Sequence, residues 1–386
     1  MNPGNTLETT RTLVSFATVS RDSNLPLIEF VENLLDDHGV SSTRVVSEDG
    51  AKANLVATIG PEEAGGVILS GHTDVVPVDG QSWSGDPFRP WVADDRLYGR
   101  GTCDMKAFIA AALAALPRMK NLARPVHLAL SYDEEVGCRG APSMIEHIAS
   151  ALPPCRAVIV GEPTSMHGVS AHKGIVALRT RVTGLEAHSS QTHRGVSAVM
   201  TAARLVSSLD AMAGRLARDA TGQAGFEPPY TTVHVGVIRG GTAINIISRD
   251  CEFIWDIRNL PCDDAGALVD EFERYCRDEV LPAMRRRHAG ASIVTETPAH
   301  APGFEVAADS PAVELVQRLT GIGGTDKVSY AAEAGLFQAA GLPAVICGPG
   351  SIDQAHKADE YIALDQVSAV DKMIERLVAE QSLPAD

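Results

Sequence analysis

The sequence lacks an apolar run long enough to cross a membrane and any pair of cysteines at CxxC spacing. Its longest apolar stretch, residues 108–116, is far shorter than the roughly 20 residues that span a bilayer, and it favours a buried helix. Seven cysteines, an odd number, are scattered along the chain, which favours reduced thiols in a cytoplasmic protein over a disulfide framework. Residues 1–5 contain no basic or apolar segment, so we expect no secretory signal.

Positive charge is also scarce. Lys and Arg total 33 against 49 Asp and Glu, for a formal net charge of −16. An acidic surface repels phosphate backbones and no basic tail offsets it, so we expect no nucleic-acid partner. Hydrophobic residues make up 45% of the 386 residues, which is enough for a substantial core. The length favours two domains over one.

Residues 1–174 alternate helical and strand patterns. Residues 27–35 have apolar positions at helical spacing. Three short apolar runs, each followed by Gly or polar residues, are typical of buried parallel strands in an α/β domain. These runs are Val67–Ser70, Val126–Leu130 and Ala157–Val160.

Residues 175–296 have a different pattern, in which apolar and polar residues alternate as in a half-exposed antiparallel sheet. The alternating runs are residues 175–182, 231–238 and 251–257, and two helical stretches, 196–213 and 264–287, separate them. The α/β pattern returns in residues 297–386. We therefore expect an α/β catalytic domain formed by residues 1–174 and 297–386, interrupted by a smaller α+β, ferredoxin-like domain that acts as a lid.

Polar residues follow each predicted buried strand, where ligands bind in open α/β sheets. The candidates are His72 and Asp74, Glu134 and Glu135, Glu162, and His356 after the run Ala344–Cys347. Another acid, Asp104, lies at the start of a predicted helix. Each motif alone is ordinary: HTD is a weak signal, EE pairs are commonly surface residues and GEP is often a turn. Their recurrence at successive strand ends favours one shared site.

Carboxylates gathered at one place repel each other and raise each other's pKa, and divalent cations would neutralise them. Imidazole and carboxylate ligands without thiolate suit zinc or a similar ion in a catalytic site. One bridging carboxylate with two further ligands per ion would give a two-metal centre.

The spacing within two motifs suggests roles. His72 and Asp74 lie two residues apart, on the same side of an extended segment, so Asp74 could hold the imidazole from behind the metal. Glu134 and Glu135 are adjacent and must point different ways. One of the two can bind metal while the other serves as the general base for metal-bound water.

Segments along nearly the whole chain resemble the M20 family of metallopeptidases and deacylases. They are SGHTDVVP, LYGRGTCDMKAF, SYDEEVG, GEPT, AHSSQTHRGVSAV, GGTAINIISRDCEFIWDIR and GPGSIDQAHKADEY. GEPT with the nearby AHKG, and the last segment, are most similar to a subgroup that deacetylates N-acetyl-ornithine in arginine biosynthesis. The resemblance implies two divalent ions, Zn²⁺ or Co²⁺, and a small N-acyl amino acid substrate. It also implies a homodimer formed through the lid.

The resemblance further implies a role for each candidate by position. His72, Glu162 and a bridging Asp104 correspond to metal ligands, and Glu135 and His356 complete the second ion. Asp74 corresponds to the supporting acid and Glu134 to the general base and acid. In the lid, His188 resembles a histidine that steadies the oxyanion in a neighbouring active site. Arg258 resembles a binder of the substrate α-carboxylate, with Asn245 assisting; a surface salt bridge for Arg258 and a structural role for His188 are the alternatives.

The chain departs from the family at three places. Ala107-Phe108 stands where Gly-Gly is frequent, which suggests altered packing at that helix start. Ser248 stands where Pro is frequent, which leaves the loop conformation open. Cys103 precedes Asp104 without an obvious His partner, so we expect it to pack rather than act as a nucleophile.

Three alternatives to the deacetylase remain at this point. The first is another M20 deacylase, such as a succinyl-diaminopimelate desuccinylase or an aminoacylase. The second is a dipeptidase or carboxypeptidase with the same chemistry. The third is an inactive metal-binding regulatory protein, against which the presence of Glu134 argues.

Overall fold

The structure is a computed structural model that describes residues 5–220 and 222–383, and the chain forms two compact units. The first unit comprises residues 1–171, 304–327 and 332–386, and the second comprises residues 172–303 and 328–331. Residues 1–4, which contribute to the expectation of no secretory signal, lie outside the described residues. Among the described helices, none has both the length and the apolar character needed to traverse a bilayer.

The first unit is built on a nine-stranded sheet with the order β1-β2-β6-β3-β7-β15-β8-β13, in which β14 pairs with β8. Its strands are β1 (Ser42–Val46), β2 (Ala53–Ile59), β3 (Gly66–His72), β6 (Val126–Ser131), β7 (Cys155–Val160), β8 (Val169–His172), β13 (Phe304–Glu305), β14 (Asp326–Val328) and β15 (Ala344–Ile346). The central strands β6, β3, β7 and β15 pair in parallel, so their carboxyl ends meet at one edge. Strand β3 is buried at every position, as its continuous apolar run predicts.

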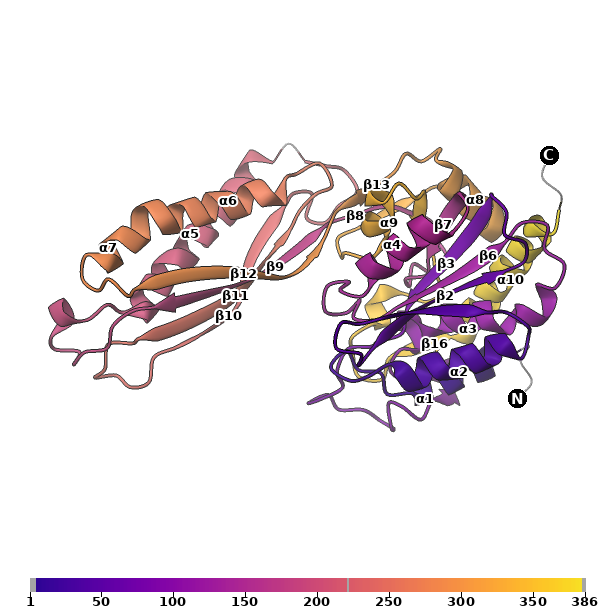
Figure 1. Ribbon diagram of the computed structural model, residues 1–386, viewed down its shortest axis with the longest axis horizontal. Coiled ribbons are helices and arrows are strands. Elements are labelled where there is room, and N and C mark those ends of the chain that lie inside the picture. Colours follow the sequence, from indigo (N-terminus) through magenta and orange to yellow (C-terminus); the bar gives the residue numbers. More distant parts are fainter. Residues whose placement is uncertain (1–4, 221, 384–386) are drawn as a thin grey trace. The chain divides into compact units, whose positions relative to one another are not determined.

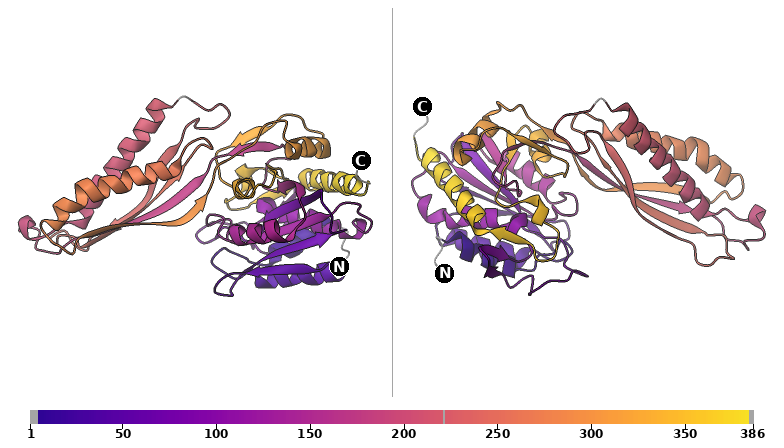
Figure 2. Two further views of the ribbon diagram at one scale, coloured as in Figure 1. Left: turned by 45° about the horizontal axis from the view of Figure 1, so that its top comes forward. Right: turned by 180° about the vertical axis from the view of Figure 1, so that it is seen from behind.

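Helices pack on both faces of this sheet. They are α1 (Thr6–Ser15), α2 (Leu25–Asp36), α3 (Ala107–Ala114), α4 (Ala141–Ala151), α8 (Pro311–Thr320), α9 (Ala334–Ala339) and α10 (Leu364–Gln381). Residues of α3, α8 and α10 share one hydrophobic core with the strands, and α4 and α9 contact each other and the sheet separately. Helix α4 lies on the near side in Figure 1, and α10 comes forward when the unit is seen from behind in Figure 2. A small sheet, β16 (Tyr361–Ala363), β5 (Arg96–Tyr98) and β4 (Trp91–Ala93), completes the unit.

The second unit has the chain order β-α-β-β-α-β of a ferredoxin-like fold. Its antiparallel sheet has the order β10-β11-β9-β12, with α5 and α6 packed on one face (Figure 2). The elements are β9 (Ile175–Thr183), α5 (Ala198–Asp219), β10 (Thr232–Gly240), β11 (Asp250–Arg258), α6 (Ala265–Tyr275), α7 (Leu281–Arg285) and β12 (Ser292–Ala301). Burial alternates along β9 and β11, so the predicted one-sided burial of these strands is confirmed.

The fold class predicted from the sequence is confirmed, but two details differ. The expected boundary between residues 296 and 297 falls inside β12, whose pairing with β9 continues to Ala301, so the second unit extends to Gly303. The predicted helix over residues 264–287 is divided into α6 and α7 by a π-helical turn at Cys276–Val280.

Candidate metal centre

His72 is the last residue of β3, and its imidazole is fixed by the strand end that follows. Nδ1 donates to the main-chain carbonyl of Asp74 at 2.8 Å, so in the neutral ring Nε2 carries a lone pair. That lone pair faces Asp104 Oδ1 at 3.1 Å and Glu162 Oε1 at 3.9 Å. Burial would lower the pKa of His72, but these carboxylates outweigh it and raise the pKa well above its usual range. Acceptors that face one another in this way need a proton or a cation between them.

Five side chains form two groups that share Asp104. The first is His72, Asp104 and Glu162, and the second is Asp104, Glu135 and His356; within each group the ligand atoms lie within 4.8 Å of one another. Asp104 presents Oδ1 to His72 and Oδ2 to His356, the latter at 3.4 Å from Nε2. His356 Nε2 also lies 3.0 Å from Glu135 Oε2. A carboxylate that offers one oxygen to each group has the arrangement of a bridging ligand.

Asp104 comes from a kinked turn, Thr102–Lys106, at the start of α3, where the backbone of Asp104 and Met105 is not helical. Gly101 precedes the turn with φ of 85°, a left-handed conformation that glycine adopts without strain. Burial raises the pKa of Asp104, but hydrogen bonds from His356 and His72 outweigh it and hold the pKa below its usual value. The same contacts with Asp104 and Glu135 raise the pKa of His356 to about 10.

The pKa values of the other two acidic candidate ligands are raised instead of lowered. Burial, and then the charge of Asp104, raise the pKa of Glu162 well above its usual range and also raise that of Glu135. Glu162 Oε1 is buried and has no hydrogen-bond partner among the described residues. An orphaned oxygen, crowded carboxylates and an imidazole lone pair fit divalent cations, which would satisfy all three. The residues present therefore fit the metal centre expected from the sequence.

Glu134 lies beside the two groups but belongs to neither. Its backbone N–H donates to Asp74 Oδ1 at 3.1 Å, and Cys138 Sγ donates to its Oε1 at 3.4 Å. Burial raises the pKa of Glu134 well above its usual range. A carboxyl whose pKa is raised in this way is suited to accept a proton and to return it.

Asp74 has more partners than the sequence suggested. Its side chain was expected to hold His72, but Oδ1 lies 3.7 Å from Nδ1, and the imidazole bonds to the main-chain carbonyl instead. The carboxylate accepts N–H groups of Glu134 and Glu135 and the hydroxyl of Ser20. Asp74 thus orients the loop that carries both glutamates as well as lying behind the imidazole.

The other three predicted residues belong to the second unit. His188 is exposed, and its Nδ1 accepts the N–H of Ser190 at 3.2 Å, so in the neutral ring Nε2 is a donor. The main-chain carbonyl of Asn245 accepts the N–H of Ser189 at 3.0 Å, which places Asn245 next to His188. Arg258 ends β11 and forms an ion pair with Asp256 at 2.8 Å.

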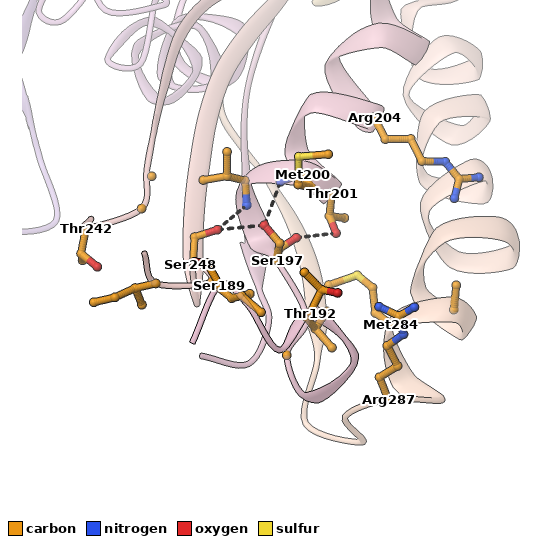
Figure 3. A pocket seen from close by; sticks show the side chains of 18 of the residues that line it. Ser189, Thr192, Ser197, Met200, Thr201, Arg204, Thr242, Ser248, Met284 and Arg287 are labelled. Atoms are coloured by element: carbon orange, nitrogen blue, oxygen red, sulfur yellow. Dashed lines mark hydrogen bonds between the residues drawn. The ribbon is translucent and has the colours of Figure 1, made fainter. Parts of the chain in front are cut away.

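Loops around His188 and Asn245 line a cavity of about 1050 Å³ within the second unit (Figure 3). Ser197 and Ser248 lie side by side there, at the start of α5. The Ser248 hydroxyl accepts the N–H of Val199 at 2.9 Å, and its carbonyl accepts the N–H of Ala198 at 2.8 Å. Ser248 therefore helps to cap α5 with a hydroxyl that the proline expected from the family resemblance would lack.

The two departures next to Asp104 are accounted for by packing. Phe108 is buried against Gly161, where a Cβ atom would lie 2.1 Å from the ring. Cys103 Sγ donates to the carbonyl of Ser351 at 3.3 Å. Burial raises the pKa of the Cys103 thiol well above its usual range, so it is protonated and no thiolate competes for metal.

Sequence reasoning missed two groups around Glu134. From the sequence, Cys138 was only one of the scattered cysteines. Its hydrogen bond to Glu134, four residues earlier in the same loop, follows no sequence pattern. Glu333, just before α9, is fully buried, and its Oε2 accepts the hydroxyl of Ser70 at 3.2 Å. Burial raises the pKa of Glu333. No sequence pattern singled out Glu333.

Residues 68–380 match the peptidase family M20/M25/M40. The acetylornithine deacetylase of Salmonella arizonae is 36% identical over 363 residues, covering 92% of this chain and 91% of that protein. The acetylornithine deacetylase of Myxococcus xanthus is 35% identical over 372 residues, covering 95% of each chain. The M20 metallo-carboxypeptidase Sso-CP2 of Sulfolobus solfataricus has a similar structure, with a TM-score of 0.75 and 19% identity over 98% of this chain and 99% of that chain.

Proposed function

The chain belongs to the peptidase family M20/M25/M40, and we propose that it is a zinc- or cobalt-dependent deacetylase that converts N2-acetyl-L-ornithine and water to L-ornithine and acetate. The observation that carries the hydrolytic part is the pair of ligand groups joined at Asp104, with Glu134 beside them. The substrate rests on the relatives named acetylornithine deacetylase, which match more than nine-tenths of this chain. Under this proposal the enzyme acts in arginine biosynthesis.

His72, Asp104 and Glu162 would hold one metal ion, and Asp104, Glu135 and His356 the other. When bound, the ions supply Lewis acidity toward the amide carbonyl and lower the pKa of a bound water. The main-chain carbonyl of Asp74 would keep the imidazole of His72 in the tautomer that presents Nε2 to the site.

Glu134 is the proposed general base and acid. It accepts a proton from the attacking water as the water oxygen bonds to the amide carbon. It returns this proton to the nitrogen of the leaving amine as the C–N bond breaks, so no net proton is gained or lost on the carboxyl group. The N–H contact to Asp74 and the thiol of Cys138 hold the carboxyl in place for both transfers.

The second unit is proposed to supply substrate-binding groups and the dimer interface. His188 Nε2–H would donate to the oxyanion, Asn245 would assist, and Arg258 would bind the substrate α-carboxylate through its bidentate fork. Near the cavity in Figure 3, Met200 is 72% exposed and Ile246 is 42% exposed, which suits burial against a second copy of the chain. A monomer by light scattering at working concentration would contradict this interface.

A substrate profile tests the proposal most directly. Purified protein with defined zinc or cobalt content is assayed on N-acetyl-ornithine, N-succinyl-diaminopimelate, other N-acyl amino acids and dipeptides. We expect the highest kcat/KM on N-acetyl-ornithine. Much faster hydrolysis of the succinyl compound or of a dipeptide would reassign the substrate within the family.

The Glu134→Ala variant separates catalysis from binding. It should bind metal as the wild type does and lose nearly all turnover. Retained turnover would overturn the role of Glu134. Loss of metal binding together with wild-type folding would instead make Glu134 a ligand. If the wild type binds metal but cleaves none of these substrates, the protein is a metal-binding regulator.

A further inference from the structure

A buried ion pair lies directly beneath the candidate metal centre, outside the residues considered so far. Arg100 Nη1 donates to Glu360 Oε2 at 2.7 Å, and both side chains are 1% exposed. Taking two charges out of water is costly, and such pairs frequently add little net stability. A buried pair of this kind is therefore expected to hold other groups in place. The other hydrogen-bond partners of Arg100 and Glu360 show which groups these are.

Glu360 holds the loop that carries Asp104. Its carboxylate accepts three main-chain N–H groups, from Gly101 at 3.0 Å, Cys103 at 2.9 Å and Asp104 at 3.1 Å. These donors lie within the four residues 101–104, which include the turn that aims Asp104 at both ligand groups. With Arg100 included, the carboxylate is fully hydrogen-bonded, so the turn has little freedom to move.

Arg100 extends the same network to His356. Its Nη2 donates to Gln81 Oε1 at 2.6 Å, and Gln81 Nε2 donates to the main-chain carbonyl of His356 at 2.9 Å. His356 has φ of 62°, a conformation that a non-glycine residue keeps only when its surroundings hold it. Glu360 also follows His356 by four residues, so one loop contributes both a candidate ligand and the support for Asp104.

We propose that Arg100, Glu360 and Gln81 form a positioning hub that sets the distance between Asp104 and His356. The hub thereby affects metal binding by Asp104, Glu135 and His356 more than metal binding by His72, Asp104 and Glu162. It touches the backbone of two members of the group Asp104, Glu135 and His356, but of only one member of the group His72, Asp104 and Glu162. None of the three hub residues is itself a ligand. The inference rests on the proposed metal centre.

Metal binding by the chelator-treated, full-length protein tests the hub without any substrate. Isothermal titration calorimetry with Zn²⁺ and with Co²⁺ gives the Kd and stoichiometry of each site. In Glu360→Gln, the amide NH₂ would face main-chain donors, so the Asp104 turn should shift. We expect the affinity for the more weakly bound metal ion to fall roughly 10- to 100-fold, which is the usual effect of removing a residue behind a metal ligand. The affinity for the more tightly bound metal ion should change less.

Two further variants make the test specific. Gln81→Leu removes the contact to the His356 carbonyl, together with the contacts that Arg100 and Trp83 make to the Gln81 amide oxygen, but it leaves the bonds of Glu360 to the Asp104 turn in place. Because Gln81 is half-buried, the variant should fold even if Glu360→Gln does not. Gln81→Leu should weaken the binding of the same single metal ion. Glu380→Gln, which breaks an ion pair with Arg156 elsewhere in the first unit, is the matched control and should leave both affinities unchanged.

The outcomes separate the hub from the metal centre itself. If the wild type does not bind two equivalents, the proposed dinuclear centre fails. If it does, but Glu360→Gln and Gln81→Leu retain both wild-type affinities, the hub is overturned. A loss of thermal stability with unchanged affinities would likewise assign the three residues a purely structural role.

Discussion

The carboxylate of Asp74 accepts the backbone N–H of Glu134 across 3.1 Å, while the main-chain carbonyl of the same residue accepts Nδ1–H of His72. Asp74 therefore fixes one candidate metal ligand and the proposed base from a single position. The carboxylate also accepts the Ser20 hydroxyl at 2.7 Å, so it is anchored from the opposite side. Movement of Asp74 would disturb proton transfer and metal geometry together.

Asp74→Asn should lower kcat by about 10- to 100-fold, the usual effect of losing a group that supports a metal site. The amide keeps only one acceptor oxygen, so the N–H of Glu134 or of Glu135 loses its partner. KM and the content of bound metal should change little, which steady-state kinetics and elemental analysis can measure. Ser20→Ala, which leaves both N–H contacts intact, serves as the control. Unchanged kcat in Asp74→Asn would rule out this orienting role.

Cys138 should tune the proton affinity of Glu134. Its Sγ donates to Glu134 Oε1 at 3.4 Å, and a donor stabilises the ionised carboxylate. Cys138→Ala should raise the pKa of Glu134, so the acid limb of the kcat/KM profile should move to higher pH. Cys138→Ser retains a hydrogen-bond donor, so its acid limb should lie at the same pH as that of the wild type. Identical profiles for the alanine and serine variants would contradict the prediction.

Arg258 offers a test of carboxylate recognition. Hydrogen bonds between charged groups contribute about 1.5–3 kcal/mol, so Arg258→Ala should raise KM by roughly 10- to 100-fold. Arg258→Lys should recover only part of the loss, because it lacks the planar fork. Asp256→Asn removes the internal partner at 2.8 Å and should not raise KM. If Asp256→Asn and Arg258→Ala behave alike, the pair is a surface salt bridge and nothing more.

His127 on β6 should make the first unit sensitive to acid. Burial lowers the pKa of His127 to about 4, and Gly66 packs so closely that a Cβ there would lie 2.4 Å from Nε2. The unfolded chain titrates near pH 6.5, so between about pH 6.5 and 4 it binds a proton that the folded chain refuses. The stability contribution is thus present above pH 6.5 and is lost as the pH falls, by about 3 kcal/mol in total.

Urea unfolding of the metal-free protein at pH 7 and at pH 4.5 measures this effect. His127→Gln removes the titrating group, so its free energy of unfolding should fall less between these two pH values than that of the wild type. His38→Gln, which removes an imidazole that bonds to the main-chain carbonyl of Leu34 in α2, provides a comparison. Equal pH dependence in wild type and His127→Gln would show that the imidazole is not held neutral.

Metal removal should destabilise the first unit selectively. The crowded acids of the two ligand groups repel one another without a counter-ion. Free metal at about 100 times its Kd would add about 2.7 kcal/mol to the free energy of unfolding. Differential scanning calorimetry with chelator should therefore show a lower Tm that Zn²⁺ restores. Hydrogen exchange along β9–β12 should be unaffected, and slower or faster exchange there would mean that metal also acts on the second unit.

The sequence predicted the strand ends and the ligands on them because a parallel sheet brings its carboxyl ends to one edge. His72 and Glu162 were found in this way, since each directly follows a continuous apolar run. Arg100, Glu360 and Gln81 were not, because their side-chain and main-chain partners lie far away in sequence, and such contacts leave no periodic pattern. The boundary near residue 296 was misplaced for a related reason: β12 alternates weakly, and only its register with β9 shows where it ends.

The close packing of Phe108 on Gly161 makes the tolerated residues at these two positions depend on each other. A Cβ at position 161 would lie 2.1 Å from the phenyl ring, so any larger residue there is incompatible with Phe108. With glycine at position 108, these ring contacts would be absent. The effect of a mutation beside Glu162 therefore depends on the residue at position 108. A substitution borrowed from a homologue at either position should be transplanted together with its partner.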